Sequence, residues 1–78
     1  MNFFKEKFQK YNEKKLKEAL KKLEFYIDLK NKLESQLKMT TNNETRIEII
    51  KKINHNDDFI NIWKKNIEII NKQSKKFE

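Results

Sequence analysis

The chain has 78 residues, a formal net charge of +7, 40% charged side chains and no Gly, Pro or Cys. A chain of this length forms one small domain with a marginal core, and without Cys it has neither disulfides nor thiolate metal ligands to reinforce that core. The absence of Gly excludes P-loop and dinucleotide-binding fingerprints, and β-hairpin turns are not expected without Gly and Pro.

The segment from Phe3 to Lys38 has the periodicity of an amphipathic helix. Its apolar stripe covers about half of the helix circumference, which is wider than the seam of a two-helix contact. We therefore expect this helix to touch more than one neighbour. Acid-first charge pairs at i,i+4 also support a continuous helix. The stripe is Phe4, Phe8, Tyr11, Leu16, Ala19, Leu23, Tyr26, Leu33 and Leu37, with Leu20 and Ile27 at its edge. The pairs are Glu6–Lys10, Glu13–Lys17, Glu18–Lys22, Asp28–Lys32 and Glu34–Lys38.

A polar run at residues 39–43 predicts a turn between two helices. Thr41 is followed three residues later by Glu44, which matches a capping box at the start of the second helix. A connection of about five residues makes neighbouring helices antiparallel. The sequence therefore predicts an all-α fold, a long antiparallel helical hairpin that associates into a helical bundle.

The segment from Glu44 to Phe77 predicts the second helix. Its middle, residues 54–58, is polar and contains residues that compete with helical hydrogen bonding. Because the apolar phase continues through this patch, we favour a continuous or slightly kinked helix; a break that gives three helices is the alternative. The apolar side is made by Ile49, Ile50, Ile53, Ile60, Trp63, Ile67, Ile70 and Phe77.

A second apolar face is predicted on this helix. Ile62 and Ile69 lie seven residues apart on the side away from the main stripe, and Ile47 falls roughly in line with them. We interpret them, with Phe25 and Trp63, as candidate contacts to a partner protein, although Trp63 also fits the core and scattered surface apolar residues are ordinary.

A lysine stripe runs along the first helix, with members three and four residues apart. Such a stripe can follow a phosphate backbone, but a solvated charged face is the simpler interpretation. Of the 19 basic residues only Arg46 is Arg, whereas base and phosphate recognition favours Arg. The stripe is Lys7, Lys10, Lys14, Lys17 and Lys21.

Two further groups of residues carry weaker functional interpretations. The aromatic residues at the start of the chain fit packing at the open end of the hairpin better than an interfacial membrane anchor. His55 with Asp57 and Asp58 lacks the further ligands or the pocket that a metal or catalytic site needs, and neither Ser35 nor Ser74 lies in a setting that would make it a nucleophile. We therefore expect no catalytic, metal or cofactor site and no small-molecule substrate.

The leading hypothesis is a non-enzymatic helical protein–protein interaction module, either self-associating, as a homodimer, or a subunit of a larger assembly. Alternatives are a basic helical protein that binds nucleic acid or ribosomes, and a small inhibitor or immunity-type protein that docks a helical face on a target. The chain has no apolar stretch that could cross a bilayer and no signal-peptide pattern. We expect it to be intracellular, in the cytoplasm or in a host cell.

Overall fold

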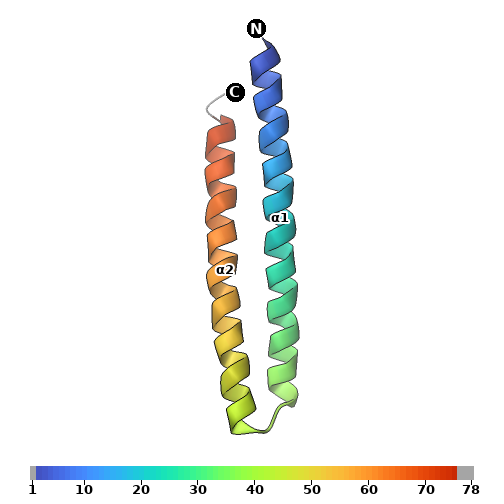
Figure 1. Cartoon of the computed structure of the whole chain (residues 1–78), viewed down its shortest axis with the longest axis vertical. Helices are drawn as coiled ribbons and strands as arrows, with labels where there is room; N and C mark the ends of the chain where they lie inside the picture. The colour runs from blue at the N-terminus through green and yellow to red at the C-terminus, as the bar shows by residue number, and fades with distance from the viewer. Residues whose placement is uncertain (1, 76–78) are drawn as a thin grey trace.

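Two antiparallel helices make up the fold. The computed structural model describes the backbone of residues 2–75 and the side chains of residues 4–73. Helix α1 (Asn2–Met39) and helix α2 (Asn43–Lys75) lie side by side along their length (Figure 1). The Cα atoms extend over 63 × 14 × 12 Å, and residues 2–75 contain no strand. The predicted all-α hairpin is confirmed, whereas its association into a bundle remains a prediction. Phe77 and the side chain of Phe3 fall outside the described residues.

The contact between the helices follows a spacing of three and four residues. This spacing brings side chains back to one narrow side of each helix. Among residues 4–73, four hydrophobic residues are buried, namely Ala19, Leu33, Ile49 and Ile60, so the core is as small as the chain length predicts. The seam consists of Asn12, Leu16, Ala19, Leu23, Tyr26, Lys30, Leu33 and Leu37 in α1, and of Arg46, Ile49, Ile53, Asn56, Ile60, Trp63, Ile67 and Ile70 in α2.

The first turns of α1 differ from the sequence prediction. Phe4 is 80% exposed and Tyr11 55% exposed, so the expectation that these two residues pack against α2 is wrong, whereas Phe8 is half-buried. Asn12 takes the seam position next to Tyr11 and is buried. Figure 1 gives one physical reason, because α1 begins beyond the described end of α2. A contact with an average period of 3.5 residues also leaves Tyr11 on a flank of the seam.

The turn is shorter than predicted and has a different cap. Only residues 40–42 separate the helices. The side-chain Oδ1 of Asn42 accepts a hydrogen bond of 3.2 Å from the backbone N–H of Thr45, which is the contact of an N-cap residue. The predicted capping box of Thr41 and Glu44 is wrong because Asn42 is the N-cap residue, which places Thr45 and not Glu44 at the third helical position.

Arg46, the only arginine of the chain, closes the turn from the side of α2. Its Nη1 donates to the backbone carbonyl of Leu37 at 2.7 Å and to that of Thr40 at 2.8 Å. Carbonyl groups at the end of a helix have no partner within the helix. The guanidinium therefore satisfies the end of α1 and ties it to the start of α2.

Helix α2 continues through the polar patch at residues 54–58, as favoured from the sequence. Asn56 is buried in the seam, and Asp57 forms an ion pair of 2.6 Å with Lys30 of α1. The polar residues therefore contribute to the helix–helix contact and do not break α2.

None of the five predicted i,i+4 pairs of α1 lies within ion-pair distance among the described side chains. Lys30 instead approaches Glu34 at 4.0 Å. These charges are solvated, and exposed ion pairs at this spacing contribute little.

Candidate interaction surface

A groove opens on one side of the hairpin, towards the end away from the turn. Its volume is about 370 Å³. Ala19, only 1% exposed, occupies a seam position with a side chain too small to fill the space beside Trp63 and Ile70. The groove is lined by Lys15, Glu18, Ala19 and Lys22 of α1 and by Trp63, Asn66, Ile69, Ile70 and Gln73 of α2.

An aromatic run crosses from one helix to the other next to this groove. The rings of Phe25 and Tyr26 meet edge to face with centroids 5.3 Å apart. Tyr26 in turn stacks on Phe59 of α2 with centroids 5.0 Å apart and planes at 14°. Such pairs stabilise beyond the area that they bury. They join the two helices on the side of the hairpin that carries the groove.

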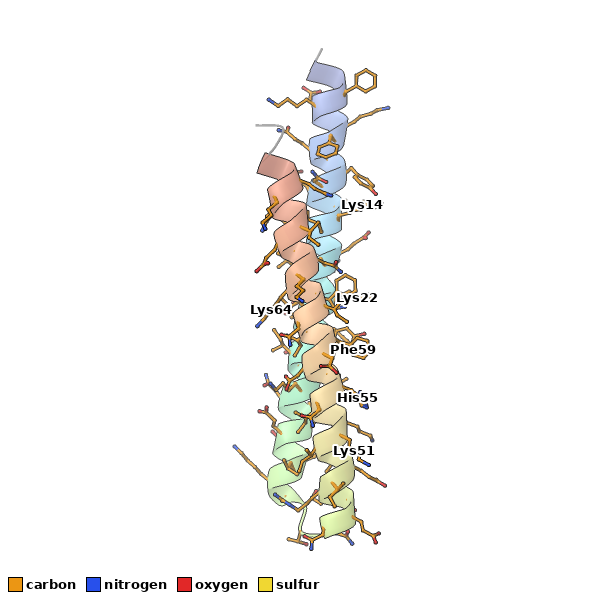
Figure 2. All side chains as sticks on the ribbon, turned by 90° about the vertical axis from the view of Figure 1, so that its left-hand side faces the viewer. Lys14, Lys22, Lys51, His55, Phe59 and Lys64 are labelled. Atoms are coloured by element: carbon orange, nitrogen blue, oxygen red, sulfur yellow. The ribbon has the colours of Figure 1, made fainter. Side chains whose placement is uncertain are left out.

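Six of the large apolar residues exposed on this side make up what we call the aromatic face: Tyr11, Phe25, Leu29, Phe59, Ile62 and Ile69. Their exposed fractions range from 36% to 60%. Each lies seven residues from another member or from a residue that lines the groove, and residues seven apart return to nearly the same side of a helix. Figure 2 shows Phe59 and Lys22 on one side of the hairpin and Lys64 on the other.

Charges are distributed unevenly around the hairpin. On the aromatic face, Lys15 lies over the ring of Tyr11 at 4.7 Å, a favourable cation–π distance, and Lys15 and Lys22 border the groove. The opposite side carries most of the carboxylates near the seam, and we call it the acidic flank: Glu6, Glu13, Glu34 and Asp57.

Lys30 reaches the acidic flank from the seam. Its hydrogen bond with Asp57 raises the pKa of Lys30 above the ordinary value for lysine, against the opposing effect of desolvation. The charges of Asp57 and Glu34 act in the same direction as the hydrogen bond.

The structure brings together three of the five predicted partner contacts. Phe25, Ile62 and Ile69 belong to the aromatic face, while Trp63 lies half-buried in the seam and lines the groove. Ile47 is exposed near the turn, fifteen residues before Ile62, which is about 22 Å along the helix. It therefore lies apart from the other four residues.

Phe59 and Leu29 were missed by the sequence reasoning. Both fall beside seam positions, and the period of 3.6 residues used for the prediction left them outside either stripe. A seam with a period of 3.5 residues places Phe59 beside Ile60 and on the side of Ile62, and this was the signal that could have found it.

The predicted lysine stripe is exposed on the side of α1 that faces away from α2. Lys10, Lys14, Lys17 and Lys21 form no ion pair with any described residue. The stripe is therefore open to solvent, and none of its members lines the groove.

A comparison of the chain with protein families, curated proteins and solved structures found no match. Within the described residues, no three His, Asp or Glu side chains gather in a way that could hold a metal ion. Neither helix, over the part that the structure describes, carries an apolar stretch long enough to cross a membrane.

Proposed function

We propose that this protein is a non-enzymatic helical interaction module that packs its aromatic face against another helical protein or a second copy of itself. The observation that carries the proposal is the placement of six exposed apolar side chains on the side of both helices that also carries the stacked rings and the groove, whereas the opposite flank, within the described residues, exposes three, Leu20, Ile27 and Ile50. Scattered single apolar residues are ordinary on a surface. A continuous group that includes stacked rings is typical of a contact surface.

The surface area of the chain supports the same proposal. The chain exposes 6771 Å², whereas a globular monomer of 9.7 kDa exposes about 5,100 Å². The excess is comparable to the area that one subunit buries in an obligate complex, about 1,000–2,500 Å². The elongated shape of the hairpin, 63 × 14 × 12 Å, accounts for this excess and leaves a long side surface that a partner could cover.

The alternative of nucleic-acid binding rests on the lysine stripe alone. The stripe is exposed and has Phe25 as an exposed aromatic neighbour one helical turn beyond Lys21, but none of its members is Arg, the residue that base and phosphate recognition favours. A small inhibitor that docks on a target would use the aromatic face in the same way as an interaction module. The aromatic face is therefore the surface to test first.

Site-specific photo-cross-linking in the native host tests the proposal without assuming a partner. A photoreactive phenylalanine analogue replaces Ile62 on the aromatic face, and the matched control places it at Lys17 in the lysine stripe. Both positions are exposed on a helix, so we expect the large side chain to leave the fold intact. We expect a discrete protein adduct from position 62 and none from position 17.

The mass of the adduct separates the possible partners. A band at twice the mass of the chain indicates a second copy, and any other mass indicates a different protein. Equal labelling from both positions, no adduct at all, or nucleic acid cross-linked only at position 17 would contradict the proposed function.

A further inference from the structure

We propose that the groove on the aromatic face binds an acidic amphipathic helix of another protein, with a bulky apolar side chain of that helix inserted between Ala19 and Trp63. The inference rests on the proposed function and specifies the chemistry of the partner. It is carried by the shape of the groove and by the charges that surround it.

The lining and the position of the groove suit the binding of a helix from another protein. Its apolar floor comes from Ala19, Trp63, Ile69 and Ile70, and its volume of about 370 Å³ is at the lower end of ligand pockets, about 300–1,000 Å³. It lies along the contact between α1 and α2 on a rod 63 Å long, so a helix of another protein can lie beside it. Amphipathic helices bind grooves of this kind through apolar residues spaced three, four and seven apart.

The rim of the groove is basic. Lys15 and Lys22 border it from α1, with Glu18 between them, and they lie seven residues apart, about 10.5 Å along the helix axis. Carboxylates two helical turns apart on a neighbouring helix would match this spacing. Exposed ion pairs contribute little affinity, but they orient a partner and accelerate its binding.

The same charges disfavour a second copy as the occupant. A copy that docked through its own aromatic face would bring its own Lys15 and Lys22 to the contact, and each chain carries a formal charge of +7. Glu18 on the same rim can compensate only one of these two lysines, and the acidic flank lies on the other side of the hairpin. Surfaces with electrostatic potentials of opposite sign associate more readily than surfaces with the same sign. An acidic helix of a different protein is therefore the better fit.

Fluorescence of Trp63 gives a direct assay, because it is the only tryptophan of the chain and lines the groove. The probe is a synthetic helical peptide that contains no tryptophan, with Leu on one side and Glu on the others. The control peptide has Lys at every Glu position. We expect the acidic peptide to shift the Trp63 emission in a saturable way, and the basic peptide to leave it unchanged.

Two double variants with the same change in net charge locate the site. Lys15→Gln with Lys22→Gln removes both lysines of the groove rim, whereas Lys14→Gln with Lys21→Gln removes two lysines that face away from α2. We expect the rim variant to bind the acidic peptide roughly tenfold more weakly, and the control variant to bind like the wild type. Circular dichroism establishes that both remain helical.

Three outcomes would overturn the inference: equal binding of the two peptides, equal weakening by the two variants, or no response of Trp63 up to millimolar acidic peptide. A protein adduct at position 62 together with any of these results means that the proposed function stands and the acidic-helix inference fails. No adduct at position 62 means that the proposed function itself fails.

Discussion

At the scale of single residues, the polar residues of the seam explain most of the difference between the apolar stripe predicted from the sequence and the observed helix–helix contact. Asn12 and Asn56 are buried between the helices, and Nδ2 of Asn12 has no hydrogen-bond partner among the described residues. An unsatisfied buried amide costs about 1–3 kcal/mol. Polar residues in such seams can fix the alignment of the helices at a cost in stability. A pattern that counts only apolar residues passes over these positions and selects Tyr11 in place of Asn12.

The ion pair between Lys30 and Asp57 predicts a specific dependence of stability on pH. Because the pKa of Lys30 is raised in the folded chain, the pair stabilises the fold fully below the ordinary pKa of lysine. This stabilisation is lost as the pH rises through the higher pKa of the folded state. We expect the free energy of unfolding of the wild type to exceed that of Lys30→Met at neutral pH. The difference should shrink above roughly pH 10.

Urea denaturation of both proteins at a series of pH values measures this difference. Lys14→Met is the control, because Lys14 forms no ion pair with a described residue and its substitution should leave the pH dependence of stability unchanged. A difference between wild type and Lys30→Met that stays constant up to alkaline pH would show that the pair does not act through the charge of Lys30.

At the scale of the helices, the position of the turn could be predicted from the sequence to within a residue or two, but the hydrogen bonds that cap the helices there could not. The run of polar residues at 39–43 is a reliable sign that the first helix ends there. Thr41 and Asn42 are both acceptable caps, and the choice between them depends on how the chain crosses to α2. The capping by Arg46 has no local signal, since it joins the start of one helix to carbonyl groups six and nine residues earlier.

Replacing the two candidate caps gives a direct test of this assignment. We expect Asn42→Ala to lower the free energy of unfolding by about 0.5–2 kcal/mol, because the N–H of Thr45 loses its acceptor. Thr41→Ala should change it by a few tenths of a kcal/mol at most, since Thr41 is exposed and makes no described hydrogen bond. Thermal denaturation followed by circular dichroism measures both. A larger effect for Thr41→Ala would restore the capping box predicted from the sequence.

The continuity of α2 was predictable because the apolar phase is unbroken on both sides of residues 54–58. Side-chain propensity argued for a break there. Packing decided the outcome, since Asn56 is buried against α1 and Asp57 pairs with Lys30. A sequence pattern does not show which residues of another helix lie opposite, and so it could not weigh that contribution.

At the scale of the whole molecule, the hairpin has differently charged sides. The aromatic face and the groove carry lysines, the outer side of α1 carries the lysine stripe, and the acidic flank carries carboxylates. The sequence predicted part of the aromatic face from Ile62, Ile69 and Phe25. It could not join them into one surface, because that requires knowing which side of α1 lies next to which side of α2. The stacked pair of Tyr26 and Phe59 settles this alignment.

Substitutions at Ile62 and Ile69 separate the contribution of the aromatic face from that of the core of the hairpin. Ile62 and Ile69 are each 52% exposed, so the double substitution Ile62→Lys with Ile69→Lys should leave helicity and thermal stability nearly unchanged. If a partner covers these residues, each contributes up to about 1.5 kcal/mol to binding, because roughly half of each side chain remains to be buried. Association should therefore weaken by up to about two orders of magnitude.

The matched control is Ile60→Lys with Ile67→Lys, which makes the same chemical change in the same helix, two residues earlier at each site. Ile60 is buried and Ile67 is half-buried in the seam, so two unpaired ammonium groups there should unfold the hairpin. Circular dichroism reports the fold, and sedimentation equilibrium, alone or with the cross-linked partner, reports association. If the Ile62/Ile69 variant unfolds as readily as the control, these residues stabilise the hairpin itself. If it folds and associates like the wild type, the aromatic face is not the contact surface.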